Sequence, residues 1–262
     1  MPGPRSLIAA VVVVGGLSGC APGTARVAFR PVVGTELAYR VVVRTTATLR
    51  LAGGAPQPST NEVTLRADQT VLSSDADGSI VRVVLAERQG RQREVNVRLD
   101  RAAQLIGVDS TDRGALGDLG VAEIFPAAAG APPNRPLRPG ERWRLDSPVT
   151  LPLAAPSRLV GQGRLVRLGA TGGRSTATIR TTSMLPVVRR TEGAEGREAV
   201  LEGVQHTTTV TTHDLADGAV ETAQAVTKAT YALRLLPPPG VEGPPVGGTL
   251  ELEVRSETSR LG

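Results

Sequence analysis

Apolar and polar residues alternate along most of this chain. From Glu36 onward one parity is mainly apolar, and the residues in between are mostly arginine, threonine and glutamate: the apolar set is Leu37, Tyr39, Val41, Val43, Ala47, Leu49 and Leu51. A period of two is typical of a β-strand with one buried and one solvated face. Because an ordinary strand has only about 5–6 residues, we expect this one to curve strongly or to contain a bulge.

The same pattern returns after a loop rich in glycine and proline over residues 53–58, so the two segments predict a long antiparallel hairpin. A second turn follows at Asp75-Ala76-Asp77-Gly78. Its aspartates faintly resemble a calcium-binding loop, but the later carboxylates of such a loop are missing. Asp-Gly is a strong turn signal by itself, and we interpret this segment as a hairpin turn.

The alternation breaks between Ser110 and Gly140. Apolar residues in this stretch predict a short helical insert near 112–125, capped by Asp112 and ended by Pro126. An extended proline-rich connector then leads to Trp143, the only tryptophan. A large ring at the point where the chain re-enters a sheet is most often a core residue, with a ligand contact as the alternative.

Alternating strands resume after the connector and continue to the end of the chain. The turn Leu215-Ala216-Asp217-Gly218-Ala219-Val220 is similar to Asp75-Ala76-Asp77-Gly78-Ser79-Ile80, which suggests two related halves, about 31–110 and 143–262. We therefore predict a mainly β fold in a single domain over 31–262. Its curved antiparallel sheet would be either a half-barrel or two packed β halves.

The N-terminus carries a targeting signal. Ile8 to Gly16 is apolar but far short of the roughly 20 residues that a spanning helix needs. The run ends at Leu17-Ser18-Gly19-Cys20, which resembles the lipobox of bacterial lipoproteins. The resemblance implies a signal peptide over 1–19, a lipidated N-terminus and tether over 20–30, and a lipid-anchored protein on the outer face of the cell membrane. An ordinary signal peptide is the alternative.

Composition limits the partners. Cys20 is the single cysteine of the 262 residues, so no disulfide supports the fold, and lipidation would give this thiol a use. The formal net charge is +5, and nearly all of the basic residues are arginine. Aromatic residues make up only 2% of the chain, which leaves few rings to stack on bases. We expect a membrane partner through the anchor on Cys20, and no nucleic acid.

Catalytic motifs are missing from the sequence. His206 and His213 are the only histidines, and their spacing of seven places them on opposite faces of one predicted strand. No serine-hydrolase elbow, zinc-protease motif or phosphate-binding loop is present. We therefore expect no catalytic residue, no metal ligand and no cofactor, and not an enzyme.

A family resemblance extends over most of the mature chain. The lipobox, the two β-rich halves and the segment Pro136-Leu137-Arg138-Pro139-Gly140-Glu141-Arg142-Trp143 resemble a group of uncharacterised bacterial lipoproteins with a Pro-hydrophobic-x-x-Gly-acidic-x-Trp connector. This resemblance implies no known activity. A looser one is to envelope lipoproteins of the LolA, LprG and LppX type, which implies a half-barrel that closes over acyl chains.

Three functional hypotheses follow. The first is a module that binds a lipid or other apolar ligand, because inward side chains that are mostly Val, Leu, Ala and Thr are small for a wide curved sheet. Its cavity lining would include Tyr39, Val41, Val43, Trp143, Tyr231 and Leu233. The second is a structural lipoprotein that presents a sheet face to another envelope protein. The third, an unrecognised hydrolase, requires a histidine beside a serine and a carboxylate.

Overall fold

A computed structural model shows an all-β protein in its described residues, which are 23–75, 78–87, 90, 92–100, 105–109, 132–149, 156–192, 198–237, 240–241 and 243–261. The strands are β1 (Ala25–Arg26), β2 (Glu36–Leu51), β3 (Gln57–Ser74), β4 (Gly78–Glu87), β5 (Gln92–Asp100), β6 (Leu105–Asp109), β7 (Pro136–Leu137), β8 (Arg142–Val149), β9 (Ser157–Thr171), β10 (Arg174–Glu192), β11 (Glu198–Asp214), β12 (Val220–Leu235) and β13 (Val246–Arg260). Cys20 and the predicted helical insert near 112–125 lie outside the described residues.

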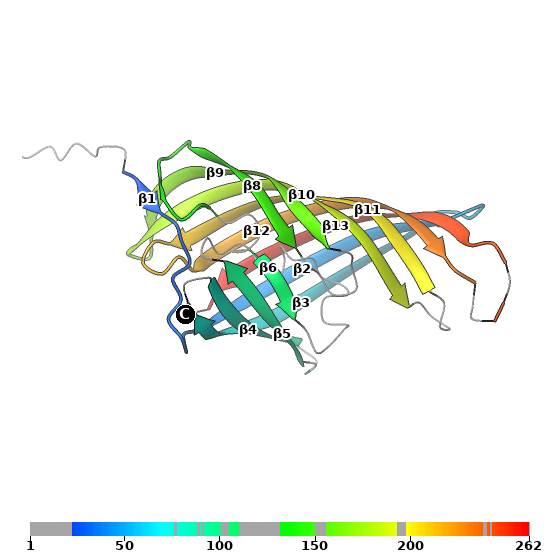
Figure 1. Ribbon diagram of the computed structural model, residues 1–262, viewed down its shortest axis with the longest axis horizontal. Helices are drawn as coiled ribbons and strands as arrows, with labels where there is room; N and C mark the ends of the chain where they lie inside the picture. The colour runs from blue at the N-terminus through cyan, green and yellow to red at the C-terminus, as the bar shows by residue number, and fades with distance from the viewer. Residues whose placement is uncertain are drawn as a thin grey trace, which may run out of the picture.

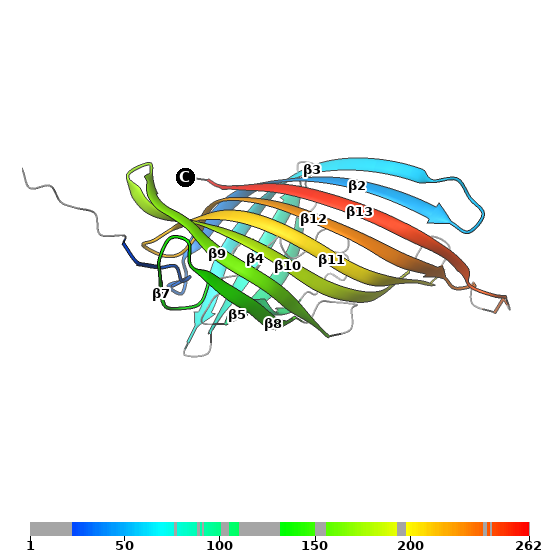
Figure 2. The same cartoon turned by 90° about the horizontal axis from the view of Figure 1, so that it is seen from above.

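Eleven of these strands form one antiparallel sheet in the order β6-β5-β4-β3-β2-β13-β12-β11-β10-β9-β8. Each half of the chain contributes a run of consecutive strands, and the pairing of β2 with β13 joins the two runs. The sheet curls until its edge strands β6 and β8 approach each other within 8 Å between Cα atoms. Figures 1 and 2 show the resulting nearly closed, barrel-like shape. The predicted curved antiparallel sheet is confirmed, and the half-barrel alternative fits it.

Strand length follows directly from the alternating sequence. β2 pairs with β3 from Glu36↔Thr70 to Leu49↔Gln57 without a register shift, so its length is accommodated by curvature rather than by a bulge in this pair. Bulges lie elsewhere, between Val71 and Ser73 of β3 and between Thr178 and Ile179 of β10. β4 pairs with β3 only from Leu65 onward, which leaves the first residues of β3 as a free edge.

The predicted apolar parity faces the interior of the sheet. Leu37, Tyr39, Val41 and Val43 of β2 are all at most 5% exposed. They belong to a large core cluster that draws residues from both ends of the sheet order, including valines of β4 and β5 and Leu185 of β10. A second cluster surrounds Trp143 and includes Val27, ahead of the main sheet. Burial of this continuous apolar face is the main source of stability in a chain without disulfides.

One end of the sheet is covered by the segment Gly23–Thr35, which we call the strap. β1, within the strap, pairs with β7, and further along Arg30 N–H donates to the Asp217 carbonyl at 2.9 Å. The strap then reaches β3, where Gly34 N–H donates to the Val71 carbonyl at 2.9 Å. In Figure 1 this dark blue segment crosses the same end of the sheet at which the C-terminus lies.

Candidate functional site

The inner face of the sheet holds all six residues predicted to line a ligand cavity. Tyr39, Val41 and Val43 come from β2 and share the large core cluster with Tyr231 of β12. Leu233, also on β12, has the same strand parity as Tyr231 and is 7% exposed. Trp143 of β8 is 8% exposed but packs in the second cluster. The structure therefore brings four of the six together and places Trp143 apart from them.

Two inward aromatic rings cover glycines on neighbouring strands. A Cβ built on Gly163 of β9 would lie 2.1 Å from Trp143 Cε2, and one on Gly203 of β11 would lie 2.9 Å from Tyr231 Cδ1. The strand pairing explains this, because Trp143 is opposite Gly163 and Tyr231 is opposite Gly203. The rings consequently occupy space above the neighbouring strand. Sequence reasoning did not find these glycines, whose partners become visible only with the register.

Buried and half-buried hydroxyl groups form a belt across the inner face of β10 to β13, which we call the hydroxyl belt. Strand pairing aligns Thr181 with Thr209, Thr209 with Ala225, and Ala225 with Ser256. Thr207 and Thr227, one step along, share a hydrogen bond of 2.9 Å between their hydroxyl oxygens. The full belt consists of Thr181, Ser183, Thr207, Thr209, Thr227 and Ser256. These side chains are small, so they add polar atoms to the interior with little bulk.

Two buried polar atoms on this face have no hydrogen-bond partner among the described residues: Trp143 Nε1 and Thr209 Oγ1. Both residues belong to one row of the sheet, because Trp143 pairs with Gly163, Gly163 with Thr181, and Thr181 with Thr209. An unsatisfied buried polar group costs about 1–3 kcal/mol. A ligand or water with acceptor and donor atoms at this row would remove that cost.

The two tyrosines of the inner face each have one polar group, the phenol hydroxyl. Tyr231 Oη accepts a hydrogen bond from Gln205 Nε2 at 2.7 Å. Burial raises the pKa of the Tyr39 phenol well above its ordinary value, while the nearby Arg260 guanidinium opposes the shift. The Tyr39 hydroxyl therefore stays protonated at physiological pH and can act as a hydrogen-bond group but not as a charge.

A buried histidine lies near the end of β11, beside the turn that leads to β12. His213 Nδ1 is 3.0 Å from the Gly218 carbonyl oxygen, which can only accept, so this nitrogen carries the proton. In the neutral ring, Nε2 then accepts from the Thr211 hydroxyl at 2.9 Å. Burial lowers the pKa of His213 below its ordinary value, and the Gly218 hydrogen bond and Asp217 partly oppose this. Burial therefore favours the neutral ring, and the sequence did not predict that this histidine is buried.

Charged side chains surround this turn. Arg260 Nη1 lies 2.9 Å from Glu221 Oε1 and 3.7 Å from Asp217 Oδ2. Arg174 Nη1 lies 3.1 Å from Glu221 Oε1 and 3.6 Å from Asp214 Oδ2. These residues come from β10, the end of β11, the β11–β12 turn, β12 and the end of β13, so they connect five segments at the covered end of the sheet.

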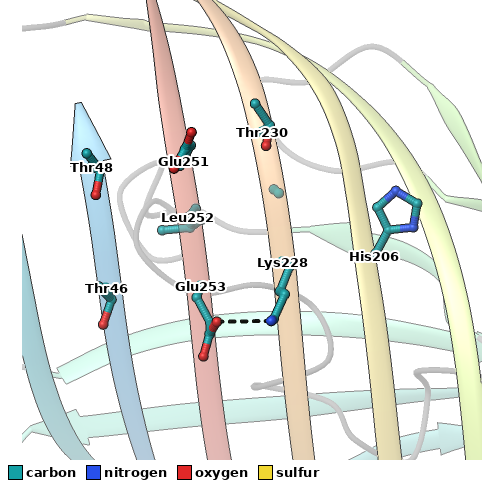
Figure 3. Close-up of a pocket in the computed structure, with 9 residues that line it drawn as sticks. Thr46, Thr48, His206, Lys228, Thr230, Glu251, Leu252 and Glu253 are labelled. Carbon is teal, nitrogen blue, oxygen red and sulfur yellow. Dashed lines mark ion pairs between the residues drawn. The ribbon is translucent and has the colours of Figure 1, made fainter. Parts of the chain in front are cut away.

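The outer face has a shallow depression of about 330 Å³ over β2, β13, β12 and β11 (Figure 3). His206 lines it from β11, on the face opposite His213. Lys228 Nζ lies 3.4 Å from Glu253 Oε2, and the hydrogen bonds from Arg255 and from Lys228 lower the pKa of Glu253. The remaining lining residues are Thr46, Thr48, Ala229, Thr230, Glu251 and Leu252. The depression is open, and Lys228 and Glu253 within it pair with each other.

Metal-ligating side chains do not gather in groups of three or more anywhere in the described part of the chain. Nor do the described residues contain a helix long and apolar enough to cross a bilayer. No protein-family model matches the chain, and no curated protein is detectably similar to it in sequence.

Proposed function

We propose that this protein is an extracytoplasmic lipoprotein, anchored to the membrane through Cys20, whose curled sheet binds a lipid or other apolar ligand without catalysing a reaction. The anchor rests on the lipobox and its short apolar run. The binding function rests on the shape of the sheet and on the side chains of its inner face.

The number of strands is the observation that carries the binding proposal. An eight-stranded barrel is just wide enough for side chains to fill, or for one small ligand to bind, and diameter grows with strand number. This sheet has eleven strands. Its inward residues on β10 to β13 are largely Ala, Ser, Thr and Val. In a sheet this wide, side chains this small would leave room for a ligand, which supports the proposal.

The unpaired atoms of the inner face indicate the polarity of such a ligand. Trp143 Nε1 can only donate, and Thr209 Oγ1 can donate or accept. Trp143 lies among aliphatic side chains and Thr209 lies in the hydroxyl belt, so a mostly apolar molecule with acceptor oxygens would satisfy both atoms. An acyl chain with a carboxyl or ester group has this chemistry.

Native mass spectrometry of the full chain, extracted from membranes, tests the proposal. We expect a mass above that of the covalently acylated chain, lost on collisional activation as a discrete lipid-sized species. Leu233→Trp should fill the interior and reduce this species and the uptake of a fluorescent fatty acid, with an unchanged or higher melting temperature. Met184→Trp, on the outer face at 44% exposure, is the matched control. Absence of bound lipid, together with a loss of about 1–3 kcal/mol in Leu233→Trp, would indicate a filled core.

A protein partner in the envelope is the second candidate function. Exposed apolar side chains lie on the outer face of β10 and β11, namely Met184, Val188 and Val204 at 44%, 45% and 37% exposure. Pro186, which lies between Met184 and Val188 on β10, is directly opposite Val204 on β11. Crosslinking in intact cells through a photoreactive residue at position 188 would distinguish this function, because a ligand carrier gives no specific protein adduct there.

A further inference from the structure

The strap is fixed to the sheet along its length rather than being a free tether. Val27 is 1% exposed, and β1 is hydrogen-bonded to β7. A Cβ built on Gly218 would lie 2.1 Å from the Ala28 carbonyl oxygen, so strap and turn are in direct contact. Thr35 accepts a hydrogen bond from Val71 N–H at 3.1 Å at the far end of the strap. Its path across the end of the sheet is therefore defined by backbone contacts.

The outward side chains of the strap combine charge with apolar surface. Val32 and Val33 are 72% and 58% exposed, the two highest values among the large apolar residues of the described chain. Val241 follows at 56%. Arg26 and Arg30, on the same segment, are exposed. Arginines attract anionic headgroups, and exposed aliphatic side chains partition into the interface beneath them.

The position of the proposed lipid anchor indicates that this surface faces the bilayer. The strap begins at Gly23, three residues after Cys20, which is a reach of only about 10 Å. An acyl chain on Cys20 would therefore hold the strapped end of the sheet at the bilayer. The far end, near Val241, would lie about 50 Å away along β12, given fifteen steps of about 3.3 Å. Figure 1 shows the strap and this loop at opposite ends of the molecule.

We propose that the outer surface of the strap, formed by Arg26, Arg30, Val32 and Val33, is a second membrane contact that binds an anionic lipid surface and orients the domain end-on to the bilayer. This inference rests on the proposed anchor. The anchor supplies attachment, and the strap surface supplies orientation, because a single tether alone leaves the domain free to tilt.

The single cysteine makes a direct test possible. In the full-length chain a lipidated Cys20 has no free thiol, so wild-type protein should not react with maleimide even after denaturation, whereas reaction would overturn the proposed anchor. Val33→Cys and the control Val241→Cys then carry one reactive thiol each. Both are labelled with an environment-sensitive fluorophore and reconstituted into vesicles of phosphatidylcholine and phosphatidylglycerol that contain a lipid-borne nitroxide quencher.

We expect quenching at position 33 to be several times that at position 241, and to fall when Arg26→Gln and Arg30→Gln are added or when phosphatidylglycerol is omitted. Arg44→Gln, an exposed arginine of β2, should leave it unchanged. Equal quenching at 33 and 241 in a protein whose Cys20 is blocked would overturn the strap contact while leaving the anchor intact. Circular dichroism of each variant confirms that the sheet is retained.

Discussion

The two Asp-Gly turns are similar in sequence but differ in surroundings. At the β3–β4 turn, Asp75 is exposed, and its N–H donates to the Gly78 carbonyl at 2.9 Å while its carboxylate accepts from Gly78 N–H at 3.0 Å. At the β11–β12 turn, Asp214 is buried and its carboxylate accepts from Ala216 N–H at 2.8 Å. Gly218 there is covered by the strap.

This difference shows that a turn sequence determines local conformation and leaves its environment open. Both segments reverse the chain between long antiparallel strands, as Asp-Gly does elsewhere. The second turn contacts the strap and has two arginines and a buried histidine around it. The hydrogen bond from Arg30 N–H to the Asp217 carbonyl helps to fix the path of the strap across the sheet. These residues are 187 positions apart, so no local sequence pattern encodes the contact.

Gly218→Ala should have the largest effect on stability. Gly218 has φ = 76°, and an added Cβ would meet the Ala28 carbonyl oxygen, so backbone strain and overpacking both apply. We expect a loss of about 2–5 kcal/mol in urea unfolding. Gly53→Ala is the control, since Gly53 has φ = 74° with no atom within 4 Å of the built Cβ, and should lose only about 1–2 kcal/mol. Equal losses would mean that the strap does not constrain the turn.

Arg260→Gln should have the next largest effect. It removes the partner of Glu221 and Asp217 in a site where the arginine side chain is only 20% exposed. We expect a loss of roughly 1–3 kcal/mol, between the values for exposed and buried pairs. The control is Arg44→Gln, whose side chain is 63% exposed in its pair with Glu62 and should change stability by less than about 1 kcal/mol. Similar losses in both variants would contradict a special role for the charges at the turn.

His213 should make stability depend on pH. Burial lowers its pKa in the folded state, so the unfolded chain binds the proton more readily. The neutral-histidine contribution is present above the unfolded pKa of about 6.5 and is lost as pH falls toward the folded pKa. Between pH 7.5 and 5.5 we expect stability to decrease in the wild type and to decrease less in His213→Gln. His206→Gln, on the outer face, should retain the wild-type slope, and a loss of slope there instead would refute the assignment.

Asp75→Ala should have the smallest effect. It removes the carboxylate that accepts from Gly78 N–H in an exposed turn, and water can replace that acceptor. We expect a loss of about 0.5–1 kcal/mol. At the covered turn the carboxylate that accepts from a turn N–H is Asp214, one position before the residue aligned with Asp75. Asp214→Ala should cost about 1–3 kcal/mol, because Ala216 N–H loses its acceptor in a part-buried site and Arg174 loses one of its two carboxylate partners. Equal effects at the two turns would remove the contrast between them.

The sequence determined the β class and the orientation of most side chains. Period-two alternation in β2 predicted that Tyr39, Val41 and Val43 face inward, and the register confirms that they share one face with Tyr231. The spacing of His206 and His213 likewise predicted opposite faces, which the structure shows as one exposed and one buried ring. Local patterns succeed here because strand geometry alone fixes which residues alternate.

Tertiary structure decided everything that depends on pairing between distant strands. The sequence left a half-barrel and two packed halves as alternatives, and only the β2–β13 pairing makes one curled sheet of the two runs. The tertiary structure also placed Trp143 over Gly163, Thr209 in the same row of the sheet, and the strap over Gly218. These contacts join residues that are far apart in the chain, and alternation of period two contains no information about which strand will be the neighbour.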